Sequence, residues 1–148
     1  MAAARPKRFV KLLVSRYRPD MNYGIDDAVM DGHRTDLSFT LFLSDPASYE
    51  GGELVIEDTL ENRSVKLAAG ELILYPSGAL HRVERVTQGE RLVVVGWVRS
   101  YVRQAAHREV LFDLELALRE VYDHDGKSAL FDRLVKTRTN LLRLWADD

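Results

Sequence analysis

Residues 70–102 read "GELILYPSGALHRVERVTQGERLVVVGWVRSYV" and alternate apolar runs with short polar breaks. The apolar runs have the length of strands, and the breaks contain the proline and glycine residues that favour turns. Similar runs occur upstream, as "SFTLFLS" at 38–44, "ELVIE" at 53–57 and "VKLAA" at 65–69. "TLENRS", between the last two, is typical of a hairpin connection. Several short strands separated in this way predict an antiparallel sandwich or barrel.

The strand pattern begins at about Arg8 and ends near Val102. After that point the apolar residues recur at helical spacing. The first helical stripe comprises Val110, Leu111, Leu114, Leu118 and Val121. After a break at 123–126, Ser128 is suited to cap a second helix, whose stripe comprises Leu130, Leu134, Leu141, Leu142 and Trp145. The chain is therefore predicted to be one α+β domain over 1–148. It is mainly β at about 8–102, and a helical hairpin at 104–146 packs against the sheet.

Composition excludes several classes of function. A chain of 148 residues suits one domain, and its formal charge of −2 gives no electrostatic basis for binding nucleic acid. It contains no cysteine, which excludes disulfides and thiolate metal sites. No apolar run has membrane-spanning length. The basic N-terminal "MAAARPKRFVKLLVSRY" has a short apolar run broken by Lys11, which favours a strand over a signal peptide. We expect a cytoplasmic protein that binds neither nucleic acid nor membrane.

His81 and Arg91 are the residues whose positions suggest chemistry. The other histidines, His33, His107 and His124, lie in polar surroundings and are expected to be exposed. His81 follows a Pro-Ser-Gly turn at the start of a strand, where a buried histidine bonded to backbone is the simplest interpretation. Arg91 begins the apolar run "RLVVVGWV", and burying it without an anion would be costly. Its planar guanidinium suits a carboxylate held by two hydrogen bonds.

An antiparallel turn at "VTQGE" (86–90) would place the strands of His81 and Arg91 side by side, facing one cavity. Non-haem iron oxygenases bind the metal through two histidines and one carboxylate and leave other positions open. A histidine for iron and an arginine for a dicarboxylic acid would fit that division of roles.

The sequence resembles the PKHD-type hydroxylases, iron- and 2-oxoglutarate-dependent dioxygenases related to prolyl 4-hydroxylases. The resemblance runs from about Pro6 to Ala146. It rests on "SRYRPDMNYG" (15–24), "RTDLSFTLFLSDPASYEGGELVIED" (34–58), "SVKLAAGELILYPSGALHRVERVTQGER" (64–91) and "NLLRLWA" (140–146). It implies a double-stranded β-helix, or jelly roll, and a hydroxylase that uses Fe(II) and 2-oxoglutarate, with ascorbate as a reductant. The substrate would be an unknown small molecule or peptide, and the oligomeric state stays open. Family members usually carry a further helical segment before the part present here.

By this resemblance His81 matches the distal iron-binding histidine, Arg91 the arginine that holds the 2-oxoglutarate carboxylate, and Asp26 the metal carboxylate. Tyr17 matches a tyrosine near the active site, while "GGEL" is assigned to the sheet edge. The family pattern Tyr-Gly-x-His-x-Asp is interrupted here, because Gly24 is followed directly by Ile25 and Asp26.

The best match to the family pattern places a two-residue gap after Gly24 and loses the first metal histidine. A two-residue deletion keeps the alternation of strand faces, so Asp26 would still point inward. Without a gap, Asp26 would replace the histidine and Ala28 the aspartate. His33 or Asp27 would be an alternative third ligand. A further alternative is a catalytically degenerate domain that acts as a binding or assembly module.

Overall fold

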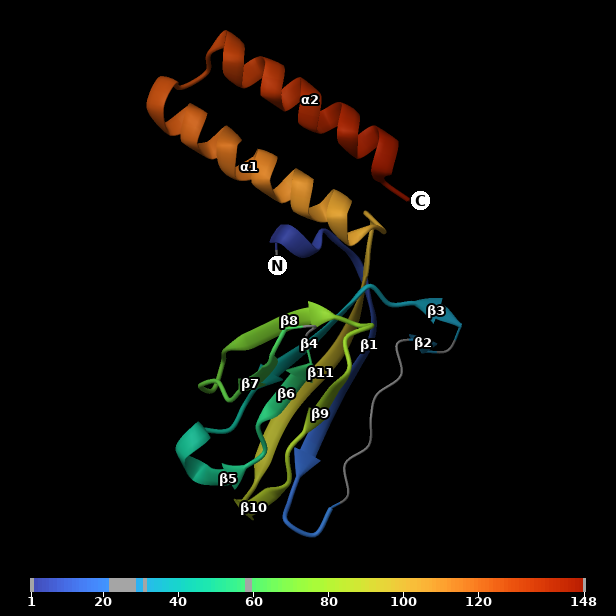
Figure 1. Cartoon of the computed structure of the whole chain (residues 1–148), viewed down its shortest axis with the longest axis vertical. Coiled ribbons are helices and arrows are strands. Elements are labelled where there is room, and N and C mark those ends of the chain that lie inside the picture. Colours follow the sequence, from blue (N-terminus) through green and yellow to red (C-terminus); the bar gives the residue numbers. More distant parts are fainter. Residues whose placement is uncertain (1, 22–28, 31, 58–59, 148) are drawn as a thin grey trace. The chain divides into compact units, whose positions relative to one another are not determined.

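The strands predicted for the first hundred residues form two main sheets in the computed structural model of the chain (Figure 1). The structure describes residues 2–21, 29–30, 32–57 and 60–147. By their internal contacts these residues fall into two compact units. One is 8–99, and the other joins 1–7 to 100–148. Each unit is described by itself below.

Unit 8–99 contains most of the strand residues. A four-stranded sheet has the order β1 (Pro6–Tyr17), β11 (Arg91–Ser100), β4 (Leu37–Phe42) and β8 (Leu72–Pro76). A three-stranded sheet has the order β7 (Asn62–Val65), β6 (Leu54–Glu57) and β9 (His81–Val83). Two short pairs join β10 (Val86–Gly89) to β5 (Tyr49–Gly51), and β2 (Val29–Met30) to β3 (His33–Arg34). A 3-10 turn, η2 (Pro46–Ser48), precedes β5.

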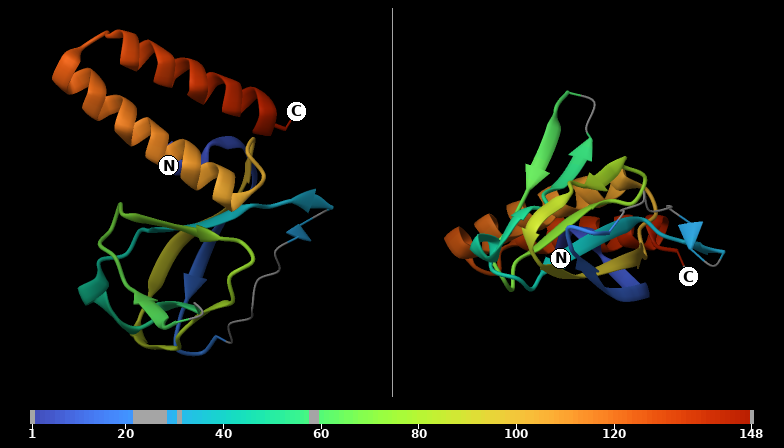
Figure 2. Two further views of the ribbon diagram at one scale, coloured as in Figure 1. Left: turned by 45° about the horizontal axis from the view of Figure 1, so that its top comes forward. Right: turned by 90° about the horizontal axis from the view of Figure 1, so that it is seen from below.

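The core of this unit lies between the two main sheets. Its buried residues come from both sheets and comprise Phe42, Leu54, Ile56, Val65, Tyr75 and Val93. In the antiparallel pair of β4 and β11, Phe42 is opposite Val93, so both side chains point to the same, inner face. Figure 2 shows β6 and β7 as a hairpin that stands out from the other strands. Antiparallel sheets packed on a shared core agree with the predicted jelly roll.

The stretch 86–90 was predicted to be a turn, and this prediction is wrong. Residues Val86–Gly89 form strand β10, which pairs with β5 and contains a bulge between Val86 and Gln88. Gly89, opposite Tyr49, has a φ of +76°, and a Cβ there would overlap the Ser48 carbonyl oxygen. The close approach of the two backbones therefore needs glycine. In the same way β7 begins at Asn62, inside the predicted hairpin connection, and ends at Val65, where the predicted strand would begin.

The helical unit confirms the predicted hairpin. Helix α1 (Ala105–Asp125) ends at the C-cap Gly126, and α2 (Ala129–Trp145) begins after Ser128, whose Oγ accepts a hydrogen bond from the Phe131 N–H at 3.2 Å. A short 3-10 helix, η1 (Ala2–Ala4), belongs to the same unit. Leu111 and Leu118 are buried, whereas Val110 and Leu130, at the ends of the predicted stripes, are about half exposed. No helix in the described part of the chain is long and apolar enough to cross a membrane.

Two buried arginines link α1 to other segments of the helical unit. Arg5 donates to the Leu111 carbonyl at 3.2 Å and pairs with Glu115 at 2.9 Å, and Arg108 donates to the carbonyls of Val102 and Arg103 at 2.9 and 2.7 Å. His107, predicted to be exposed, is only partly so, because its ring stacks on Trp145 with centroids 4.0 Å apart. That the hairpin covers an outer face of the sheet stays a prediction.

Candidate functional site

Arg91 is a buried cation without a carboxylate partner among the described residues. Its side chain is 1% exposed, and its guanidinium lies beside the Tyr49 hydroxyl. It stands at the first position of β11, and its parity with Val93 directs it toward the inner face of the sheet. Buried charges are normally paired, because leaving water without a partner is costly. A buried guanidinium of this kind is chemically suited to pair with an anion.

Aromatic rings form two sides of the Arg91 site. The guanidinium carbon lies 4.7 Å from the centroid of Tyr17 and 5.2 Å from that of Phe42, distances at which ring faces attract a cation. Tyr17 is the last residue of β1, and the structure places its ring beside Arg91. Such contacts hold the guanidinium in place but leave its N–H groups unused.

Gly52 forms a third side, a role that sequence reasoning missed when it assigned "GGEL" to the sheet edge. Its φ is +71°, and a Cβ there would lie 3.0 Å from Arg91 Cδ and 3.1 Å from Tyr49 Cε2. Any side chain at this position would strain the backbone and push on both neighbours. The second glycine of the pair is therefore part of the site.

Tyr49 was also missed, because it lies 42 positions before Arg91 in a stretch that reads as a loop. It is 3% exposed, and its hydroxyl lies beside the Arg91 guanidinium. Burial raises the pKa of Tyr49, and Arg91 partly offsets this through its charge and a side-chain hydrogen bond. The Tyr49 phenol and the Arg91 guanidinium are thus neighbouring buried polar groups.

His81 is buried at the start of β9, with 8% of its surface exposed. Its Nδ1 lies 2.9 Å from the Ala79 carbonyl oxygen, and its ring packs edge-on against Tyr75 with centroids 5.0 Å apart. Since a carbonyl can only accept, Nδ1 is the donor in this hydrogen bond, and Nε2 is the nitrogen that carries the lone pair in the neutral ring. Metal-binding histidines are held in the same way, with the second ring nitrogen donating to a carbonyl or carboxylate.

His81 and Arg91 lie in different sheets. His81 pairs with Ile56 of β6, whereas β11 lies between β1 and β4, so the predicted neighbouring strands are not formed. Both residues nevertheless border one hydrophobic core. Arg91 contacts Phe42 and His81 contacts Tyr75, and these two aromatic residues belong to one buried cluster.

The remaining predicted ligands divide into two groups. Asp26 and Asp27 fall outside the described residues. His33 is exposed, as expected, and its ring accepts a hydrogen bond from Arg8 at 3.1 Å. Within the described ranges, no three His, Asp or Glu side chains come together as a metal site.

Comparison with known proteins decides the family. A model described as the 2OG-Fe(II) oxygenase superfamily matches residues 12–99, more than half of the chain. The chain belongs to the 2OG-Fe(II) oxygenase superfamily. It is 57% identical to a PKHD-type hydroxylase of Parvibaculum lavamentivorans, a match that covers 99% of this chain and 68% of that protein. A PKHD-type hydroxylase of Maricaulis maris is 54% identical, over 98% of this chain and 67% of the relative.

Solved structures agree with this membership. A prolyl 4-hydroxylase of Pseudomonas putida superposes with a TM-score of 0.52 at 27% identity, over 65% of this chain and 54% of that one. A 2OG-Fe(II) oxygenase family oxidoreductase of Burkholderia pseudomallei superposes equally well at 20% identity, which supports the fold alone. The superfamily match lies within unit 8–99 and contains His81 and Arg91, so this 2OG-Fe(II) oxygenase unit holds the candidate site.

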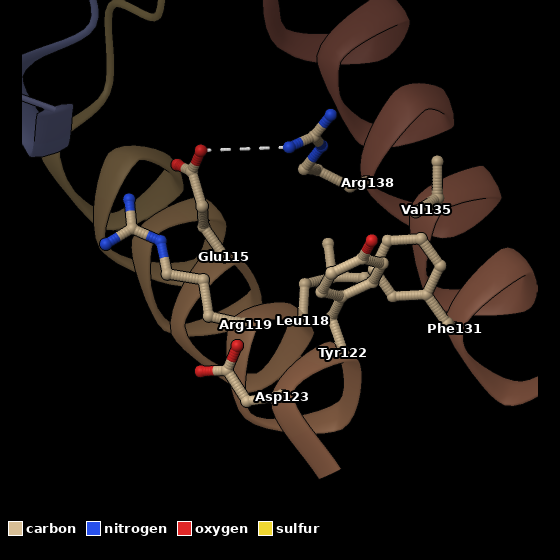
Figure 3. Close-up of a pocket in the computed structure, with 8 residues that line it drawn as sticks. All are labelled: Glu115, Leu118, Arg119, Tyr122, Asp123, Phe131, Val135 and Arg138. Atoms are coloured by element: carbon tan, nitrogen blue, oxygen red, sulfur yellow. Dashed lines mark ion pairs between the residues drawn. The ribbon is translucent and has the colours of Figure 1, made fainter. Parts of the chain in front are cut away.

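A hollow lies in the helical unit of this oxygenase-family chain, between α1 and α2. It has a volume of about 450 Å³ and is lined by Glu115, Leu118, Arg119, Tyr122, Asp123, Phe131, Val135 and Arg138 (Figure 3). The rings of Tyr122 and Phe131 meet across the helices with centroids 5.2 Å apart. Glu115 is already paired with Arg5 at 2.9 Å and Arg138 at 3.7 Å. None of the predicted site residues lines it.

Proposed function

We propose that this chain is an Fe(II)- and 2-oxoglutarate-dependent dioxygenase that hydroxylates a small-molecule or peptide substrate. The observation that carries the proposal is Arg91, buried to 1% exposure with no carboxylate paired to its guanidinium among the described residues. A carboxylate held by two parallel hydrogen bonds would satisfy that geometry. 2-Oxoglutarate, which the superfamily name specifies, has such a carboxylate at its far end.

The residues would divide the work as follows. Arg91 would bind the distal carboxylate, with Tyr17 and Phe42 keeping the guanidinium in place and water out. His81 would offer Nε2 to Fe(II) while Nδ1–H stays bonded to the Ala79 carbonyl, and Asp26 would be the carboxylate ligand. Bound iron, with 2-oxoglutarate as the co-reductant, supplies the activation of oxygen in this family. Ascorbate, as an added reductant, belongs to the same proposal.

A non-catalytic binding module is the second candidate. The observation in its favour is that Ile25 and Asp26 directly follow Gly24, with no histidine between them. Two protein ligands hold iron more weakly than the set of two histidines and one carboxylate that oxygenases use. Such a module could still bind the dicarboxylic acid through Arg91.

An anaerobic Fe(II) titration, with and without 2-oxoglutarate, separates the two candidates. An oxygenase should bind Fe(II), bind it more tightly with 2-oxoglutarate, and lose this binding in His81→Ala. A folded chain that binds 2-oxoglutarate but no Fe(II) would favour the binding module.

A companion variant tests the gap itself by inserting two residues, the second a histidine, between Gly24 and Ile25. The insertion keeps strand parity, so it should strengthen Fe(II) binding and increase decarboxylation of 2-oxoglutarate. Equal binding by parent and insert would mean that another residue completes the site, and His33 would be mutated first.

A further inference from the structure

The outward side of helix α1 carries a row of acidic residues. The buried Leu111 and Leu118 mark the inner side of the helix. Away from them, at steps of four, three and four residues that stay on one helical face, lie Glu109, Asp113, Leu116 and Glu120. The three carboxylates are exposed, and Leu116 among them is 41% exposed. In total α1 has six acidic and two basic residues, so its outward side is negative.

Helix α2 carries the opposite charge in the same pattern. It has four basic residues and one acidic residue. Its outward side, at steps of three, four and three residues, carries the exposed Arg133, Lys136, Asn140 and Arg143. Leu144 lies beside this row and is 75% exposed. The hairpin therefore presents an acidic row on one helix and a basic row on the other.

The two rows are not neutralised within the hairpin. Glu115 and Arg138 join the helices on their inner sides, at 3.7 Å (Figure 3). Among the described residues, no side chain of either row takes part in an ion pair. Like charges three or four residues apart destabilise a helix, and each row contains such a pair. The helix dipole favours only Arg143, in the last turn of α2, since the first turn of α1 has no acidic residue.

The rows match each other in length. From Glu109 to Glu120 the helix rises about 16 Å, and from Arg133 to Arg143 about 15 Å. In a parallel alignment every acid meets a base, in the pairs Glu109–Arg133, Asp113–Lys136 and Glu120–Arg143.

We propose that the acidic row of α1 docks on the basic row of α2 in a second copy of this chain. The charge complementarity selects this partner, because one chain carries both rows and a second copy supplies the opposite charge to each. The exposed Leu116 and Leu144 add apolar surface to the contact. Each copy can use both rows, so the contact either closes as a dimer or continues into a longer assembly.

Sedimentation velocity on the full chain tests the contact. The parent should self-associate, and raising the salt from about 0.1 to about 1 M should weaken the association, because the screening length falls from about 10 to about 3 Å. Reversing the acidic row should weaken it at least about tenfold, through the combined variant Glu109→Lys, Asp113→Lys and Glu120→Lys. The control makes the same change in net charge at exposed positions of unit 8–99 and should associate like the parent: Asp20→Lys, Glu50→Lys and Glu61→Lys.

A charge exchange then shows whether the two rows meet. Reversing the basic row should weaken self-association as strongly, through Arg133→Glu, Lys136→Glu and Arg143→Glu. One reversed chain now has two basic rows and the other has two acidic rows, so a mixture should associate where neither variant does alone. A chain with all six reversals should self-associate again, because the effects of residues in contact are coupled.

A parent that stays monomeric at low salt overturns the proposal, and so does self-association that both reversals leave unchanged. Circular dichroism checks that each variant keeps its helices. Where a reversed chain does not fold, neutral replacements keep the side-chain shape and should still weaken the association, through Glu109→Gln, Asp113→Asn and Glu120→Gln. Association of this neutral variant equal to that of the parent would also overturn the proposal.

Discussion

Replacing Arg91 with methionine should stabilise the ligand-free protein. Arg91 is 1% exposed with no carboxylate partner among the described residues, so the folded state carries the cost of its desolvation. Exchanging buried ionic groups for apolar ones of similar volume is often stabilising by about 1–4 kcal/mol. The contacts with Tyr17 and Phe42 offset part of this, at about 0.5–2 kcal/mol each. We expect Arg91→Met to raise the free energy of unfolding by up to about 3 kcal/mol in urea denaturation.

With 2-oxoglutarate present, the parent should become more stable than Arg91→Met. At a concentration of 2-oxoglutarate about 1,000 times its Kd, the parent gains about 4.1 kcal/mol by linkage, and Arg91→Met gains nothing. Arg108→Met is the matched control, because Arg108 is similarly buried but donates to the carbonyls of Val102 and Arg103. It should cost about 1.5–3 kcal/mol at any ligand concentration. If Arg91→Met is instead strongly destabilising and the parent ignores the ligand, a carboxylate of the chain already neutralises Arg91.

Three further predictions concern single positions. Gly52→Ala should cost about 1–3 kcal/mol in urea denaturation through overpacking, and it should also weaken 2-oxoglutarate binding. The control is Gly70→Ala, since Gly70 also has a positive φ, +89°, but no atom within 4 Å of an added Cβ, and this variant should bind 2-oxoglutarate like the parent. Since the pKa of Tyr49 is raised above 10.0 in the folded state, the stability it contributes is present below pH 10.0 and lost as pH rises through the folded pKa. Tyr49→Phe should flatten that alkaline loss in denaturation curves measured across pH. Ser128→Ala should remove the cap on Phe131 N–H and cost the helical unit about 1 kcal/mol by thermal circular dichroism.

The helical hairpin could be predicted because its signals are local. A stripe at helical spacing, a serine cap and a glycine at the end of α1 all lie within a few residues of what they determine. Only the ends of the stripes misled, since Val110 and Leu130 satisfy the spacing yet remain half exposed. Spacing identifies a face, and the neighbouring element decides how much of that face is buried.

The sequence predicted the antiparallel β class of the first unit but not which strands pair with which. "VTQGE" has the polar residues and glycine of a turn, and nothing nearby reveals that it pairs with Tyr49–Gly51, more than thirty residues earlier in the chain. That pairing depends on Gly89 meeting Ser48, a contact between distant segments. Local pattern could not contain this information.

The sequence singled out the charged residue of the candidate site, Arg91, but not Tyr49 and Gly52, which pack around it. An arginine at the start of an apolar strand is costly to bury, so its position singled out Arg91 as a candidate. His81 was singled out by its position after a turn, and the resemblance added Tyr17 as a further candidate. Tyr49 and Gly52 carry no such signal, because an aromatic before a glycine pair is common loop chemistry. Only the folded backbone brings them to Arg91.

Each of the two units can be followed by the fluorescence of its own tryptophan. Its two tryptophans fall one to each unit, with Trp97 in 8–99 and Trp145 in the unit formed by 1–7 and 100–148. Trp97 is 3% exposed, whereas Trp145 is stacked on an imidazole. Indole emission depends on its surroundings, so the two residues should differ in emission maximum and in quenching. Single-tryptophan variants would therefore follow each unit separately in fluorescence, and would reveal whether one melts before the other.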